Sequence, residues 1–336
     1  MGLEFTYYRK NMRDLLIAIA LPPSAGFAGS QLQNLGATRN QGVEMSFTAT
    51  PIDRKNFRWE SRLNFAYNNN KLLALDSIRS CIAWELKAGE SCPPGRAIAE
   101  DIPGGVSYSP GLQRNRVGFP LGAFFVRYPK RDANGNYMFT GTSPNLVPVY
   151  DTTFVYAGVA WPPRTMSWSS NFNIFNNVNV YGLFDYQGGH KQFNYKEYNR
   201  CAVTTNGPNC ERLAKPGVSP EDRALWGSVG NPTVLTSPMT QTMYLEKADF
   251  VKLRDVSVTF LLPRRVLSRT RMESASLVLS GHNLAMWTKY SGLDPEVNGY
   301  GSNVVRGSGS SSQFARVDAY SMPMTRRYTM QLNITY

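Results

Sequence analysis

The last eleven residues, RRYTMQLNITY, alternate strictly between apolar and polar side chains after the arginine pair. Successive side chains of an extended strand point to opposite faces, so one face carries Tyr328, Met330, Leu332, Ile334 and Tyr336 while the other is polar. Chain ends usually fray. A strand that keeps two distinct faces to the final residue predicts a sheet with a different environment on each side.

Similar alternation recurs upstream and predicts eight antiparallel strands. In FRWESRLNFAYN, for example, Phe57 and Trp59 share the face opposite Arg58. The phase changes within DFVKLRDVSVTFLLP, which predicts a β-bulge near Arg254 and Asp255. The strand candidates are residues 2–15, 42–50, 57–68, 165–175, 178–188, 248–262, 275–286 and 326–336.

The connections between these strands alternate between short and long. The short ones are PIDRKN, the pair Asn176–Asn177, and PRRVLSRTRMES; the long ones are residues 16–41, 69–164, 189–247 and 287–325. Outer-membrane barrels have short periplasmic turns and long outer loops. A soluble β-sandwich is the alternative, but it has no reason to place every long loop at one end. The pattern favours a transmembrane antiparallel β-barrel.

Composition supports strands and turns and excludes a membrane helix. Aromatic residues make up 12% of the chain and charged residues 18%, against a typical charged share of about 25%. The longest apolar run, Leu15–Leu21, is far shorter than the roughly 20 residues that a membrane helix needs. No signal peptide follows Met1. The chain is therefore expected to be either cytosolic or a piece whose N-terminal part is missing.

The sequence offers little for catalysis. His190 and His282 are the two histidines, and no GxSxG elbow or similar motif orders a Ser/His/Asp set. We predict no enzyme activity, no cofactor and no metal. The net charge of +12 would suit nucleic acid, but the basic residues are spread along the chain without a recognised binding module. We therefore predict no nucleic-acid partner.

Four cysteines form two close pairs, Cys81 with Cys92 and Cys201 with Cys210. Short loops favour pairing within each pair, and neither has the CxxC spacing of a zinc site. We predict two disulfides, with free thiols as the alternative. Disulfides in loops indicate an oxidising compartment such as the periplasm or the cell surface.

Aromatic and planar polar residues are frequent in the long connections. Sugars are bound by aromatic faces and by side chains that hydrogen-bond hydroxyl groups. The alternative for each ring is that it only packs the loops together. As a group, these loops are the predicted place for ligand contacts. The substrate-binding candidates are Trp84, Trp161, Tyr195, Tyr198, Arg200, Trp226, Tyr290 and Tyr300.

Six stretches carry a family resemblance, in order from residue 2 to residue 336: GLEFTYYRKNMRDLL, NFRWESRLNFAYNNNKLLAL, GFPLGAFF, DFVKLRDVSVTFLLPRRV, LVLSGHNLAMWTKYSGLDPEV and YTMQLNITY. Together they resemble the C-terminal third of SusC/RagA-type TonB-dependent outer-membrane transporters. The segment RDANGNYMFTG is shorter than the acidic, Gly-rich stretch of that family. With Asp132 as its only carboxylate, it predicts a hairpin turn at Asn134–Gly135 instead of a calcium loop.

The resemblance implies a 22-stranded barrel in the Gram-negative outer membrane, of which residues 1–336 form a C-terminal portion of about eight strands, without the plug domain and TonB box. It implies import of oligosaccharides or peptides, energised by TonB through the missing N-terminal part, and a SusD-like surface lipoprotein as partner. The aromatic end of the last strand, Tyr336, resembles the signal read by the insertion machinery. The alternative is a soluble or surface-attached all-β carbohydrate-binding module.

Overall fold

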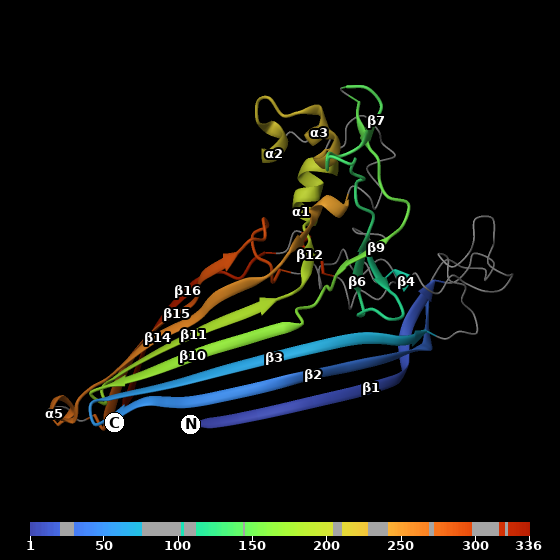
Figure 1. The fold of residues 1–336 in the computed structure, drawn as a ribbon. Helices are drawn as coiled ribbons and strands as arrows, with labels where there is room; N and C mark the ends of the chain where they lie inside the picture. Colours follow the sequence, from blue (N-terminus) through green and yellow to red (C-terminus); the bar gives the residue numbers. More distant parts are fainter. Residues whose placement is uncertain are drawn as a thin grey trace.

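A computed structural model describes residues 1–20, 30–75, 102–103, 112–143, 145–203, 210–227, 241–268, 272–297, 316–319 and 322–336. Figure 1 shows one large sheet whose strands converge at the end that carries α5 and the C-terminus, with the folded loops rising at the opposite end. None of the helices in the described ranges is long and apolar enough to cross a membrane.

The large sheet has eight antiparallel strands in the order β1-β2-β3-β10-β11-β14-β15-β16, with β1 and β16 at its edges. Every neighbour in this order is also the next long strand along the chain, so the sheet is a meander. The strands are β1 (Gly2–Ala20), β2 (Ser30–Arg54), β3 (Phe57–Leu75), β10 (Arg164–Ile174), β11 (Val178–Gly188), β14 (Phe250–Leu261), β15 (Ser274–Thr288) and β16 (Arg327–Thr335).

Smaller elements lie in the loops. The short strands are β4 (Ile102–Pro103), β5 (Gln113–Asn115), β6 (Ala123–Val126), β7 (Phe139–Thr140), β8 (Val147–Pro148), β9 (Val155–Gly158), β12 (Lys191–Phe193) and β13 (Leu245–Lys247). The helices are α1 (Tyr195–Tyr198), the π-helix η2 (Asn199–Val203), α2 (Glu211–Ala214), α3 (Pro220–Trp226), the 3₁₀-helix η3 (Thr242–Tyr244) and α5 (Arg264–Leu267).

The register of the large sheet aligns apolar side chains into rows that cross it. Since directly paired residues of neighbouring strands point to the same face, each row lies on one side of the sheet. The apolar side remains open: Phe5, Trp287 and Leu332 are 66%, 54% and 62% exposed. Two of the rows are Phe5–Met45–Phe65–Met166–Tyr186–Val251–Trp287 and Phe57–Ile174–Val178–Phe260–Leu277–Leu332.

The other side of the same sheet is polar. One row runs through Glu4, Ser46, Asn64, Ser167, Asp185 and Lys252 on successive strands. A sandwich would bury its apolar face against a second sheet, whereas here the apolar side chains are exposed to the surroundings. The expectation of a soluble sandwich is therefore not met, and the sheet has the two-sided pattern of a barrel wall.

The eight predicted strands and the short turns are confirmed, but several predicted boundaries are wrong. The expected connection 16–41 is largely strand, because β1 continues to Ala20 and β2 begins at Ser30. Likewise, β3 continues past residue 68 to Leu75. The backbone ladder between neighbouring strands goes on after the side-chain alternation has ended, for example at the pair Ile17↔Gln33.

Two local predictions from the sequence hold. The register of β14 shifts between Leu253 and Asp255, which is the predicted bulge. This bulge brings Val256 and Val258 into the apolar rows although they have the opposite phase to Leu253. The hairpin turn at Asn134–Gly135 is also present: Gly135, with a φ of 85°, donates its backbone N–H to the Asp132 carbonyl at 3.0 Å.

A lysine on the apolar side tests which environment this side faces. We expect Leu332→Lys to destabilise the protein folded in phosphatidylcholine vesicles by about 2 kcal/mol, since a charge on the lipid side must be desolvated. Its neighbour Asn333 lies on the opposite side, so Asn333→Lys is the matched control and should change the stability by less than about 0.5 kcal/mol. Equal effects of the two variants would contradict a lipid-facing row.

Candidate functional site

Segments of the connections between β3 and β10, between β11 and β14, and between β15 and β16 together form a small core of their own. Phe193, Tyr198 and Tyr244 are buried in it, and the Tyr198 and Tyr244 rings meet edge to face at 5.5 Å between centroids. A disulfide joins Cys201 to Cys210 in the same core. Cys81 and Cys92 lie outside the described residues. Because both sulfurs of the Cys201–Cys210 pair are in the disulfide, they provide no thiolate for a metal.

Local sequence signals begin the short helices of this core. The Asn194 side chain accepts a hydrogen bond from the Glu197 backbone N–H at 3.0 Å and caps α1. Ser219 caps α3 in the same way, with Pro220 at the first helical position. These caps satisfy backbone N–H groups that a short helix otherwise leaves unpaired.

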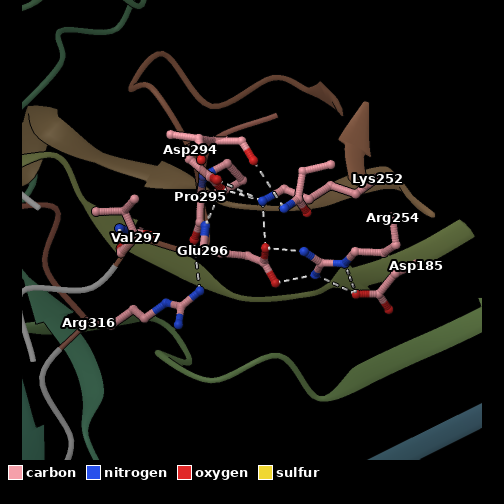
Figure 2. Close-up of polar contacts among 11 residues, drawn as sticks. Asp185, Lys252, Arg254, Asp294, Pro295, Glu296, Val297 and Arg316 are labelled. Atoms are coloured by element: carbon pink, nitrogen blue, oxygen red, sulfur yellow. Dashed lines mark hydrogen bonds and ion pairs between the residues drawn. The ribbon is translucent and has the colours of Figure 1, made fainter. Parts of the chain in front are cut away.

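An ion-pair network connects the loop after β15 to the polar side of the sheet (Figure 2). Lys252 on β14 is buried; its Nζ lies 2.7 Å from Asp294 Oδ2 and 2.5 Å from Glu296 Oε2. Arg254 donates from Nη1 to Glu296 Oε2 at 2.7 Å and from Nη2 to Asp185 Oδ2 at 2.7 Å. Two cations on one strand thus hold a loop segment by two carboxylates.

Strand geometry explains why these charges meet. Lys252 and Arg254 are two positions apart and so share the polar side of β14, where Lys252 is paired in register with Asp185 on β11. Burial by itself raises the pKa of Glu296, but hydrogen bonds from Arg254 and Lys252 and their positive charges outweigh it, and the pKa is lowered overall. Glu296 is therefore ionised at neutral pH.

Arg316 extends this network to the neighbouring loops. It is buried, and its Nη2 donates to the Pro295 carbonyl at 2.8 Å and lies 3.4 Å from His190 Nε2. Its guanidinium also lies 5.4 Å from the centre of the Trp161 ring. Arg316 therefore links the loop after β15 to the segments before β10 and after β11.

His190 is neutral in this arrangement. Burial and the adjacent Arg316 lower its pKa from 6.5 to about 4, against the opposing charges of Asp249 and Glu296. A neutral ring is consistent with an Nε2 lone pair that faces the Arg316 guanidinium. The ring is buried, so a proton added to it would have no water to solvate the charge.

A groove opens where β3 continues beyond the start of β10. The Asn68 backbone N–H donates to the Pro163 carbonyl at 2.9 Å, and the Leu72 N–H to the Phe119 carbonyl at 2.9 Å. Between these two contacts lies a pocket of about 410 Å³, which we call the outer groove. Its lining includes Tyr67, Asn68, Asn69, Asn70, Tyr156 and Trp161.

The sequence-predicted binding residues fall into three groups. Tyr198 and Tyr290 are buried; the Tyr290 hydroxyl donates to Asp318 at 3.0 Å, and burial followed by the Asp318 charge raises its pKa. Tyr195 and Trp226 pack against the loop core, and Arg200 pairs with Glu197 at 3.1 Å. Trp161 lines the outer groove. Trp84 and Tyr300 lie outside the described residues.

The structure also brings Asp255, His282 and Ser280 together on β14 and β15. His282 Nδ1 contacts Asp255 Oδ1, and its Nε2 lies 3.5 Å from the Ser280 hydroxyl. However, that hydroxyl also contacts Thr329 on β16. The group stands as a polar cluster.

Several important residues did not stand out from the sequence. The acidic pair Asp294 and Glu296 lies inside GLDPEV, which was noted only for its family resemblance, and Lys252 looked like one of many scattered charges. The NNN run at residues 68–70 was a usable signal of an unusual position, since asparagine is depleted in strands and β3 nevertheless continues through the run to Leu75.

The Lys252–Asp294 pair should show strong coupling in a double-mutant cycle. Lys252→Met leaves Asp294 without its cation and should lower the stability of the loop by about 3 kcal/mol, whereas adding Asp294→Asn to that variant should cost much less. Hydrogen-exchange protection of residues 294–297 measures both. The exposed pair Arg58–Glu60, at 2.6 Å, is the control and should couple by less than about 1 kcal/mol. Equal coupling in both cycles would contradict a stabilising role of the ion-pair network for the loop after β15.

His190 should make the loops sensitive to mild acid. Its folded pKa of about 4 lies below the unfolded value of 6.5, so its contribution is complete above pH 6.5 and is lost as the pH falls toward 4. We expect about 1.4 kcal/mol lost per pH unit within this window. The urea midpoint for exchange of residues 191–203 at pH 7 and pH 5 measures the effect. His190→Gln should show a flatter dependence; an unchanged slope would contradict the assignment.

Comparisons with known proteins agree with this architecture. No protein-family model matches the chain. It is 26% identical over 353 aligned residues to TonB-dependent receptor P26 of Formosa agariphila, covering 99% of this chain and 32% of that protein. It is also 23% identical to TonB-dependent receptor SusC of Bacteroides thetaiotaomicron, covering 87% of this chain and 27% of SusC. The chain thus spans about a third of the length of these relatives.

A solved structure shows the same fold. The RagAB peptide importer in its closed-closed state matches with a TM-score of 0.67 and 19% identity, over 99% of this chain and 33% of the matched chain. The likeness covers the eight-stranded sheet and is at the level of the fold. The chain is therefore identified as a relative of the SusC/RagA-type TonB-dependent receptors of the outer membrane, and its extent fits the C-terminal part of their β-barrel.

Proposed function

We propose that residues 1–336 form the C-terminal portion of the barrel of an energised outer-membrane importer of oligosaccharides or peptides. The observation that carries this proposal is the single eight-stranded sheet with one exposed apolar side and one polar side. Similarity to TonB-dependent receptors supports it: nearly the whole of this chain aligns with about a third of each relative.

In this proposal the two sides of the sheet have different solvents. The apolar rows face lipid, where the sheet ladder pairs backbone groups of neighbouring strands, and the polar row that contains Asp185 and Lys252 faces the lumen. The edges β1 and β16 are where the remaining strands of a 22-stranded barrel would join. The ion-pair network then fixes the loop after β15 at the outer end of the lumen wall.

Partners follow from the same placement. The TonB system would act through the N-terminal part of such a receptor, and a SusD-like surface lipoprotein would cover the outer loops. Arg54, Lys55 and Arg265 lie at the turn end of the sheet, a position suited to contacts with lipid phosphates. Tyr336 ends the last strand and would be part of the signal for insertion. No catalytic role is proposed, in line with curated relatives named as receptors.

Heat-modifiable mobility tests the barrel and uptake tests the transport. The complete gene product that contains residues 1–336 should require detergent and should migrate differently on gels with and without prior heating, because a closed β-barrel keeps its shape in detergent until it is boiled. Cells that carry it within its complete gene should accumulate a labelled oligosaccharide or peptide mixture in a TonB-dependent manner.

Two results would count against the proposal. Extraction without detergent, combined with mobility that heating does not alter, would favour the alternative of a soluble or surface-attached carbohydrate-binding module. A heat-modifiable barrel whose uptake of both mixtures is independent of TonB would retain the barrel and reject the energised import.

A further inference from the structure

The outer groove offers an aromatic surface that the rest of the molecule holds in place. Trp161, Tyr156 and Tyr67 are 44%, 43% and 40% exposed there. The buried Arg316 guanidinium lies 5.4 Å from the centre of the Trp161 ring, while nearly half of the Trp161 side chain remains exposed. The Tyr156 ring is braced by Phe119 and Phe125, at 5.1 and 5.9 Å.

Amide groups lie beside these rings. Asn70 is engaged: its Nδ2 donates to Asn40 Oδ1 at 2.8 Å and its Oδ1 accepts from the Leu121 backbone N–H at 2.8 Å. These bonds tie β2, β3 and the 118–122 segment together and fix the floor of the groove. Asn68 and Asn69 are exposed, and neither side chain hydrogen-bonds to another described residue. As successive residues of β3 they point to opposite sides of the strand, Asn68 to the polar side with Asn70 and Asn69 to the side of Tyr67. The Asn68 amide offers donors and an acceptor on the polar side.

The lining of the outer groove contains no aspartate, glutamate, lysine, arginine or histidine among the described residues. A short peptide carries a terminal ammonium and a carboxylate, and such groups bind best where an opposite charge compensates their loss of water. Sugar rings are neutral; their C–H faces pack on aromatic rings, and their hydroxyl pairs match the geometry of planar amides.

We propose that the outer groove is a binding site for a neutral, hydroxyl-rich ring ligand, a sugar unit of an oligosaccharide. The Trp161 ring is the stacking platform, Tyr156 flanks it, and Asn68, on the polar side of β3, binds hydroxyl groups. This assignment rests on the proposed function, in which the groove lies on the path of the imported ligand, and it selects oligosaccharide over peptide.

Binding measurements in detergent on the complete gene product that contains residues 1–336 test the assignment. The probes are cellohexaose, maltohexaose, laminarihexaose and xylohexaose, with the peptide Gly-Ser-Gly-Ser-Gly-Ser as the competitor. We expect at least one hexasaccharide to bind. Trp161→Ala should weaken that binding by about tenfold, and Trp161→Phe by less, because a smaller ring still stacks. The peptide should not displace the sugar.

Trp168 provides a matched control. It is 42% exposed, as Trp161 is, but lies on β10 in the apolar rows, away from the groove. Trp168→Ala should therefore leave sugar affinity unchanged, and heat-shifted mobility shows whether each variant is folded. Equal affinities of folded Trp161→Ala and wild type, displacement by the peptide, or failure of every hexasaccharide to bind a heat-modifiable barrel would each overturn the inference. The import proposal would stand in all three cases, because uptake is measured separately.

Discussion

The continuous backbone ladder of the large sheet is the constraint on which the other features depend. Once eight strands are paired in one register, every side chain is assigned to one of two sides, and a slip of one residue would exchange them. The apolar rows exist only because residues such as Phe65 and Met166 are register partners on neighbouring strands. The polar row on the reverse side follows from the same pairing.

The loops depend on that register as well. Lys252 and Asp185 face each other because β11 and β14 are paired at that position, and the loop carboxylates of Asp294 and Glu296 complete a network that neither strand could form alone. Buried charges of this kind are costly unless each finds its partner. Here the cations Lys252 and Arg254 are paired with the carboxylates of Asp185, Asp294 and Glu296, and Arg316 extends the network to His190 and Trp161.

A structural feature could be predicted from the sequence when it depends on neighbouring residues, and could not when it depends on contacts between residues far apart in the chain. Alternation is a local property, so the eight strands, the turn at Asn134–Gly135 and the bulge beside Asp255 could be predicted from neighbouring residues. The continuation of β1 to Ala20 could not, because it depends on pairing with β2. For the same reason Tyr198 and Tyr290, which look like binding aromatics in a loop sequence, are packing residues: their burial depends on contacts between distant loops.

The bulge in β14 separates two parts of one strand with different surroundings: one part makes charged contacts with the loops, and the other carries apolar side chains of the sheet. Lys252 on the loop side of the bulge and Arg254 within it hold the charged network; on the turn side, Val256, Val258 and Phe260 continue the apolar rows. The extra residue absorbs the mismatch in phase between them. The outer end of this strand can therefore change its charges over evolutionary time, and with them the loops above, without altering the part that stays in the membrane.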